Sequence, residues 1–322
     1  MEEMGYTSSA IMLQYLMNDA PLGGLNIRFY LHTGKQHGLE EHWQEMVEEN
    51  FDLIIIPDAS SNDSEYAKEF SCPILVIDHH QVEDEITADN LIVINNQLSP
   101  NYKNKYLSGA SMCYQFCRAL DDALNINAAD KYLDLAALGS IGDVMSSLEI
   151  ENQYIWHQGL SNINNYFFQT LLRKQSYSIC GESTENINNI CDSLTPMNVA
   201  FYIVPLINAM IRVGTYEEKE RLFLAFIAGC ELVPSNKRGA KGEMEEVAIE
   251  STRECVNARS HQNKMKAEMV EKLEQKILKY DLLENKILFI ELDEDDDFPP
   301  ELNGSSWPAN TFSVYQRGHI SG

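Results

Sequence analysis

The sequence predicts an α/β protein built on a parallel sheet with helices on both faces. Two observations support this expectation. Apolar, β-branched segments at residues 52–56, 73–77 and 91–94 have the composition of strands that are buried on both faces. Segments at residues 40–49 and 63–70 have helical patterns and separate these strands. Strands that alternate with helices form parallel sheets, because each crossover helix covers a face of the sheet.

One more strand is expected before these, at residues 25–32 (LNIRFYLH). From residue 108 onward the pattern becomes helical, and Ser108 is a suitable N-cap for a helix that ends near residue 124. Further helices are expected at residues 128–145, 154–159, 165–174, 197–212, 217–228 and 243–280.

We expect three parts along the chain. Residues 1–232 form the parallel-sheet domain with a helical extension, and residues 233–280 form a joint and a long connecting helix. Residues 281–322 form the start of a second α/β domain, which is expected to be truncated. The joint is placed at residues 234–242 (PSNKRGAKG), which are rich in Pro, Gly and basic residues, and a new strand is expected at residues 286–291.

The cysteine content and the start of the chain favour a cytoplasmic location without membrane association. There are seven cysteines and no Cys-x-x-Cys, so a disulfide framework is not expected. Cys113 and Cys117 lie four residues apart on an expected helix, where packing explains them better than metal binding. No secretion signal is recognised, and no apolar run approaches the roughly 18 residues of a membrane span.

The formal net charge of −25 restricts how the protein can bind nucleic acid. A surface of this sign repels phosphates, so a nuclease of this composition needs a local basic groove or bound metal ions. Lys237, Arg238 and Lys241 are candidates for such a groove, although ordinary solvated charges explain them almost as well. The same charge fits an enzyme that acts on a small phosphorylated molecule.

Polar residues with the chemistry of a metal site follow the buried strands. Asp58 comes directly after one strand, and Asp78, His79 and His80 come directly after the next. Asp143 lies in an otherwise apolar helical stretch. Carboxylate and imidazole together suit Mn, Zn or Fe, and ligands gather at the carboxyl ends of parallel strands. Helix capping explains Asp58 on its own, and a cap or a buried salt bridge explains Asp143 on its own.

The order and spacing of Asp58, the Asp78–His79–His80 triplet and Asp143 resemble three motifs of the DHH phosphoesterases. The segments LSGASMCYQF, VPLINAMIRVGT, PSNKRGAKGE and ELNG…VYQR resemble the RecJ branch of single-strand-specific exonucleases. The resemblance covers nearly the whole chain. It implies two divalent ions, Mn²⁺ or Mg²⁺, and hydrolysis of a phosphodiester.

The resemblance also implies a role for each motif residue. Asp58 is the carboxylate that bridges the metals, and His79 and Asp143 bind one of them. Asp78 orients the site through hydrogen bonds, and His80 faces the scissile phosphate.

The substrate residues follow from the same resemblance. Ser108 and Gly109 open a helix whose N–H groups can hold a phosphate, and Asn208 and Arg212 contact the substrate backbone. The partner is then single-stranded DNA or a short oligonucleotide, while protein partners are not predicted.

The first family motif, Asp-x-Asp-x-Asp-Gly, is not found. Gly5 to Ser9 match its tail, but Glu2 and Met4 stand where aspartates are expected. We therefore expect a chain that is incomplete at both ends, that holds one ion and that is a poor enzyme.

Three functions remain open. The first is a RecJ-like single-stranded nucleic acid exonuclease. The second is a phosphoesterase acting on an oligonucleotide, a cyclic dinucleotide or pyrophosphate, and the third is a catalytically impaired scaffold in replication or repair.

Overall fold

The computed structural model describes residues 5–32, 38–83 and 85–280. In this part of the chain, one parallel sheet consists of β1 (Ile54–Pro57), β2 (Ile74–Asp78) and β3 (Leu91–Asn95), hydrogen-bonded in that order. Pro57 is paired with Ile77, and Asp78 is paired with Asn95. The residues that follow each strand therefore emerge at one edge of the sheet.

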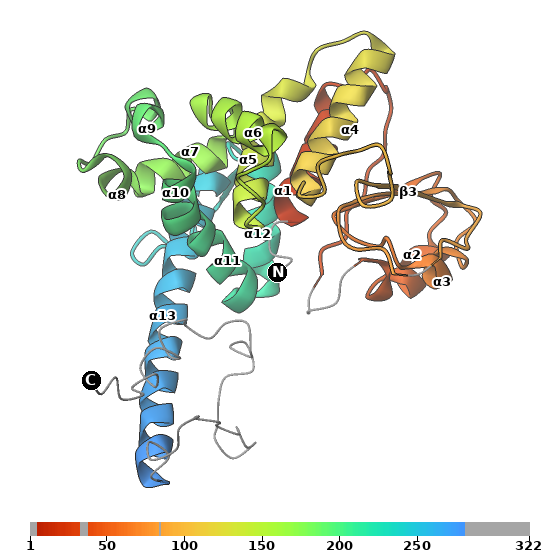
Figure 1. The fold of residues 1–322 in the computed structure, drawn as a ribbon. Helices are drawn as coiled ribbons and strands as arrows, with labels where there is room; N and C mark the ends of the chain where they lie inside the picture. The colour runs from red at the N-terminus through yellow and green to blue at the C-terminus, as the bar shows by residue number, and fades with distance from the viewer. Residues whose placement is uncertain (1–4, 33–37, 84, 281–322) are drawn as a thin grey trace, which may run out of the picture.

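Helices cover both faces of this sheet, as the sequence predicts (Figure 1). On one face, α2 (Trp43–Glu48) and α3 (Ser64–Ala67) contribute Met46 and Ala67 to a small core with Ile74 and Val76. On the other face lie α1 (Gly5–Asn18) and α4 (Gly109–Leu124), which belong to the main core that also contains Ile77. Alternate residues of β2 thus point into two different cores.

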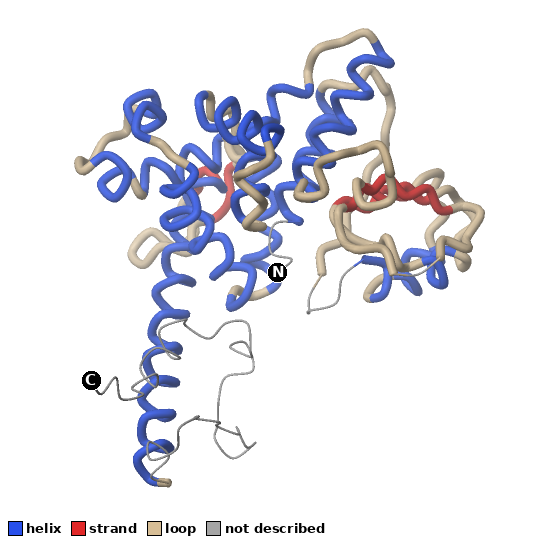
Figure 2. The backbone as a smooth tube through the Cα atoms, viewed as in Figure 1, coloured by secondary structure: helices blue, strands red, loops and turns tan. Residues whose placement is uncertain are grey.

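The rest of the described chain is almost entirely helical, as Figure 2 shows. Its helices are η1 (Gly38–Glu40), η2 (Ala129–Tyr132), α5 (Leu133–Gly142), α6 (Ile150–Ser161), α7 (Tyr166–Lys174), α8 (Ser176–Cys180), α9 (Ile187–Ser193), α10 (Pro196–Asn198), the π-helical turn η3 (Val199–Ile203), α11 (Val204–Val213), α12 (Tyr216–Ala228) and α13 (Val247–Lys279). The long helix expected at residues 243–280 is thereby confirmed as α13.

Residues 234–242 connect β4 (Leu232–Pro234) to β5 (Met244–Glu246), which form an antiparallel hairpin. Asn236 donates its backbone N–H to the buried carboxylate of Glu250 on α13, so this loop is fixed to the helix that follows it. The hairpin is absent from the sequence prediction. The strand expected at residues 286–291 and the part assigned to residues 281–322 lie outside the described residues.

The strand predicted near the start of the chain is wrong. Residues 25–32 form no strand: within the described chain, no backbone–backbone hydrogen bond joins this segment to β1, and Leu25 and Phe29 are exposed. Side chains hold it instead, for example Arg28 against Glu49 and Phe29 against Phe223. A pattern typical of a strand is not sufficient without a partner ladder.

The sequence prediction also missed helix α1. Ala10, Ile11, Met12 and Tyr15 are buried in the main core, and Thr7 and Ser8 are buried too. A helix that is enclosed on most sides lacks the alternation of polar and apolar faces from which a surface helix is recognised.

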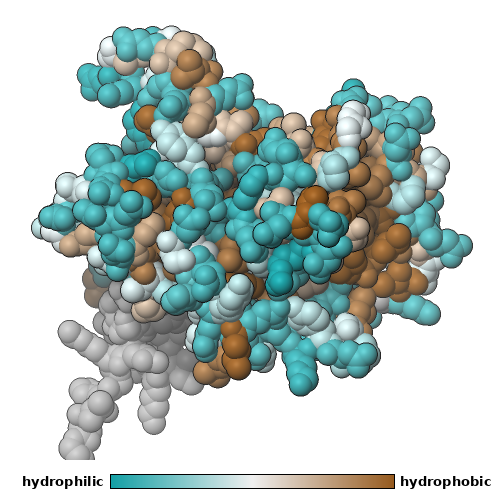
Figure 3. Space-filling view, turned by 90° about the horizontal axis from the view of Figure 1, so that it is seen from above, coloured by the Kyte–Doolittle hydropathy of each residue, from teal (hydrophilic) through white to brown (hydrophobic). Residues whose placement is uncertain are grey.

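Pro196–Val213, spanning α10 to α11, is long and apolar enough to cross a membrane, contrary to the expectation of no such run. Val199, Ile203, Ile207 and Met210 are buried in the main core, which explains the apolar composition. Figure 3 shows a face that is mostly hydrophilic, with hydrophobic residues gathered on the side that carries α4 and the sheet in Figure 1.

Candidate metal centre

Asp58 follows β1 in an uncommon backbone conformation. Its φ of 67° lies in the left-handed region, which Asp tolerates better than most residues. The backbone N–H of Asp58 still donates to the carbonyl of Ile77, at 2.7 Å, so the turn is anchored to β2. The side chain is 7% exposed and Oδ2 accepts a hydrogen bond from Ser8 on α1. Strained backbone of this kind concentrates at functional sites.

The other carboxylate oxygen of Asp58, Oδ1, lacks a hydrogen-bond donor among the described residues. Oδ1 is buried and accepts no hydrogen bond, although Nε2 of His79 lies 3.3 Å away. Burial alone would lower the pKa of His79, but the nearby carboxylates of Asp58 and Asp78 outweigh it and raise that pKa. A buried carboxylate oxygen without a donor is costly unless a cation neutralises it.

Asp78 ends β2 and holds the two histidines that follow it. It is 1% exposed, and Oδ1 accepts hydrogen bonds from the backbone N–H groups of His79 and His80. Oδ1 also lies 2.6 Å from Nδ1 of His80, while Ser61 donates its N–H to Oδ2. Burial would raise the pKa of Asp78, but these hydrogen bonds lower it well below its usual range. Asp78 is therefore an ionised, fully engaged carboxylate that orients His80.

The hydrogen bond to Asp78 also changes the titration of His80. It is the largest of the effects that raise the pKa of this imidazole. The carbonyl oxygens of the two histidines are fixed from the end of β3, because Asn95 donates its side-chain N–H to His80 and Gln97 donates to His79. The sequence analysis did not identify Asn95 or Gln97, and their position directly after a buried strand was the available signal.

The side chains of Asp58, His79 and His80 converge. Each offers one ligand atom within 4.8 Å of the others. Their chemistry, one carboxylate and two imidazoles around a buried oxygen without a donor, fits a divalent transition metal.

Asp143 lies at the C-cap of α5, beyond this group of three. Its backbone N–H donates to the carbonyl of Gly139, and Gly139 packs against Ala110 of α4 and Thr7 of α1. The end of α5 is therefore close to the helix starts that enclose Asp58. Its role as a metal ligand stays a prediction.

Ser108 and Gly109 are buried at the start of α4. As predicted, Ser108 is the N-cap, and its hydroxyl accepts the N–H of Ser111 at 3.2 Å. Gly109 lies against the carboxylate of Asp58. Gly109 thus contributes to the position of Asp58, and the contact of Ser108 and Gly109 with a substrate remains a prediction.

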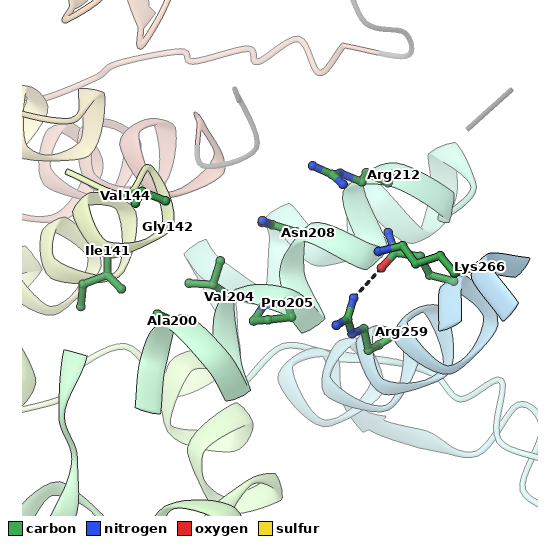
Figure 4. A pocket seen from close by; sticks show the side chains of 11 residues that line it. Ile141, Gly142, Val144, Ala200, Val204, Pro205, Asn208, Arg212, Arg259 and Lys266 are labelled. Atoms are coloured by element: carbon green, nitrogen blue, oxygen red, sulfur yellow. Dashed lines mark hydrogen bonds between the residues drawn. The ribbon is translucent and has the colours of Figure 1, made fainter. Parts of the chain in front are cut away.

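Asn208 and Arg212 lie together in a separate cavity of about 270 Å³ between α11, α13 and the end of α5 (Figure 4). They share it with Arg259, Gln262 and Lys266 of α13, which the sequence analysis missed. The pKa of Arg259 is lowered, first by burial and then by the charge of Arg212, so positive charge is concentrated here. Oδ1 of Asn208 is buried without a hydrogen-bond partner.

Comparison with known proteins places this geometry in context. Residues 5–140 match the family described as "DHH family, N-terminal domain". YorK of Bacillus subtilis (strain 168), named as a prophage-derived single-strand DNA-specific exonuclease, is 37% identical over 291 residues, which are 89% of this chain and 47% of YorK. RecJ of the same organism, named as a single-stranded-DNA-specific exonuclease, is 27% identical over 230 residues, covering 69% of this chain and 27% of RecJ.

The fold also matches solved structures. A crystal structure of exonuclease RecJ bound to manganese superposes with a TM-score of 0.63 and 24% identity, covering 85% of this chain and 63% of that one. The chain thus spans about half the length of YorK and a smaller share of RecJ. Residues 5–140 thus match the DHH family domain, and the chain is a homologue of the YorK and RecJ exonucleases.

Proposed function

We propose that this chain carries the metal-dependent phosphodiesterase centre of a nuclease that degrades single-stranded DNA. The observation that carries the proposal is the convergence of Asp58, His79 and His80 around a buried carboxylate oxygen that accepts no hydrogen bond. The names of the homologues support single-stranded DNA as the substrate. We further place the protein in the cytoplasm, without a membrane partner.

In this proposal Asp58 and His79 hold Mn²⁺ or Mg²⁺, together with Asp143. A bound divalent ion supplies Lewis-acid activation of water and of a phosphate oxygen. Asp78 keeps Nδ1 of His80 engaged, so the opposite ring nitrogen can donate to a phosphate oxygen when the imidazole is protonated. The hydrogen bond to Asp78 raises the pKa of His80, which favours that protonated form.

Arg212, Arg259 and Lys266 give the proposed enzyme a local attraction for phosphates. They line the cavity beside Asn208, and a local basic surface is what a protein of net charge −25 needs to hold nucleic acid. Ser108 and Gly109 open α4, whose N–H groups can hold a phosphate, and Gly109 also positions Asp58, because it touches its carboxylate. Lys237, Arg238 and Lys241 lie exposed on the β4–β5 loop and are less specific candidates.

A direct test compares substrates and metals. The chain is incubated with 5′-labelled single-stranded DNA, the matching duplex, a cyclic dinucleotide and pyrophosphate, each with Mn²⁺, with Mg²⁺ and with chelator. We expect Mn²⁺-dependent release of nucleotides from the single strand, at a slow rate because the first family motif is not found. Asp58→Asn should abolish it, whereas Asp52→Asn, at an exposed position before β1, should not. Cleavage that persists in Asp58→Asn would refute the proposed centre.

One observation favours a second function, the hydrolysis of small phosphorylated molecules. The net charge of −25 opposes long polyanions more than it opposes a dinucleotide. Faster turnover of the cyclic dinucleotide or pyrophosphate than of DNA would favour this function. Binding of single strands without any hydrolysis would instead favour a scaffold.

A further inference from the structure

A second group of metal-binding side chains lies outside the DHH centre. His32, Glu41 and His42 each offer one ligand atom within 4.8 Å of the others. Nδ1 of His32 lies 3.0 Å from one carboxylate oxygen of Glu41, and Nε2 of His42 lies 3.9 Å from the other. The two imidazole rings are stacked, with centroids 5.6 Å apart and an interplanar angle of 29°. One carboxylate is thus approached by imidazoles on both of its oxygens.

His42 is held in place by its backbone surroundings. Nε2 lies 3.1 Å from the carbonyl oxygen of Leu31. A carbonyl only accepts, so Nε2 carries the proton and approaches Glu41 as an N–H group, and Nδ1, on the side of Glu45, carries the lone pair that would bind the ion. Metal-binding histidines commonly fix their ring through such a bond to a carbonyl. Oε2 of Glu45, an exposed side chain one turn away, lies 3.9 Å from Nδ1 and is a further oxygen donor within reach.

The surroundings concentrate negative charge on this group. The pKa of Tyr216 on α12 is raised, first by burial and then by the nearby carboxylates of Glu220, Glu41 and Glu45. Lys219 is one positive charge in the neighbourhood, and Glu41 is among the carboxylates that act on it. The side chains of Glu41 and His42 are 13% and 18% exposed, so the group is shielded but reachable from solvent.

We propose that His32, Glu41 and His42 bind Zn²⁺ or a similar borderline divalent cation. Two imidazoles and one carboxylate form a recurrent zinc donor set, which leaves a coordination position for Glu45 or water. The proposal is independent of the DNA-degrading function proposed above.

Such an ion would have a structural effect. His32 ends the segment 25–32, which pairs with no strand within the described chain, whereas Glu41 and His42 precede α2. Leu39 donates its backbone N–H to Ser60 and Asp63, which lie just after Asp58. A metal that joins His32 to Glu41 would thus tie the irregular segment to the region that supports the DHH centre.

The experiment first inactivates metal binding at the DHH centre, so that only the second group can bind an ion. In a chain carrying Asp58→Asn and His79→Ala, Zn²⁺ binding is measured by titration calorimetry and Co²⁺ binding by visible absorption. We expect one ion per chain with micromolar affinity. Zn²⁺ should also raise the melting temperature by at least ~2 °C. Glu41→Gln or His42→Ala added to this background should abolish both effects, whereas His261→Ala, at an exposed position on α13, should leave them unchanged.

Circular dichroism checks that each variant is folded. If His42→Ala does not fold, Glu41→Gln and His32→Ala carry the test, since these side chains come from different segments. The proposal is overturned if the folded background chain binds no Zn²⁺, or if folded Glu41→Gln binds it as tightly as its parent. It is also overturned if Co²⁺ gives the same absorption spectrum with and without His32.

Discussion

Gly109 and Asp58 are in contact across the start of α4: a Cβ atom at position 109 would lie 1.8 Å from Oδ1 of Asp58 and 2.1 Å from its Cγ. The same carboxylate stays within 3.7 Å of a Cβ built at Gly5. The proposed metal-binding carboxylate is therefore packed against the backbone of Gly109, which leaves no room for a side chain there, whereas the contact with Gly5 is ordinary van der Waals contact. Neither its rotamer nor its distance from His79 can be kept if Gly109 gains even a methyl group.

Gly109→Ala should consequently displace Asp58 and remove metal-dependent cleavage. The expected measurements are a loss of Mn²⁺ binding in calorimetry and a fall in the cleavage rate of single-stranded DNA by at least ~10²-fold, as for a misplaced catalytic group. Gly23→Ala is the control, because a Cβ there meets nothing within 4 Å. Equal activity of the two variants would show that Asp58 is not held by this contact.

Asp78 should affect metal binding and activity by orienting the imidazole of His80. Asp78→Asn keeps the shape of the side chain but replaces a carboxylate that accepts hydrogen bonds from His79, His80 and Ser61. We expect metal affinity or activity to fall by about 10–100-fold. The pKa of His80 should also fall toward its ordinary value, which NMR of the imidazole can follow. An unchanged titration of His80 would contradict this role.

Asp121 should stabilise the fold in a pH-dependent way. It is buried and accepts hydrogen bonds from the hydroxyl of Tyr15 and from the backbone N–H groups of Ala128 and Ala129. Burial would raise the pKa of Asp121, but these hydrogen bonds lower it. Its stabilising contribution is therefore complete above the unfolded-state pKa of about 3.9 and is lost as the pH falls below that value.

The measurement is the denaturant-induced unfolding of Asp121→Asn. Asp122→Asn is the control, because the side chain of Asp122 is exposed. At neutral pH we expect Asp121→Asn to lower the free energy of unfolding by about 1–3 kcal/mol and Asp122→Asn to leave it nearly unchanged. The difference between the two variants should shrink as the pH is lowered below 4. A constant difference would argue against a lowered pKa.

The cavity lined by Arg212, Arg259 and Lys266 should bind phosphates in a salt-dependent way. Arg259→Glu is expected to weaken binding of single-stranded DNA across sequences and to reduce the slope of log K against log salt by about 1. Lys264→Glu is the control, because Lys264 lies exposed on the same helix and outside the cavity. If both variants lose affinity equally, the effect is one of general charge.

The parallel sheet and the DHH triplet could be predicted because their signals are local. Buried strands such as residues 73–77 are short, apolar and β-branched, and the side chains that follow them must emerge at the carboxyl edge. The N-cap at Ser108 could be predicted for the same reason, because a capping side chain accepts a hydrogen bond from a backbone N–H only three residues away.

Only the tertiary structure decided what depends on distant partners. Residues 25–32 have a strand-like pattern but pair with no strand in the described part of the chain, and α1 is buried without the alternation that marks a surface helix. Arg259 and Lys266 reach the cavity of Arg212 from a helix that is polar by composition.

The two candidate metal groups, one with Asp58 and one with Glu41, also differ in how far the sequence predicts them. The sequence itself determined that Asp58 and His79 follow neighbouring parallel strands, which forces them together. No local pattern in the sequence indicates that His32 stacks on His42 or that Gly109 lies against Asp58. Each of these contacts joins segments that are brought together by packing around a core.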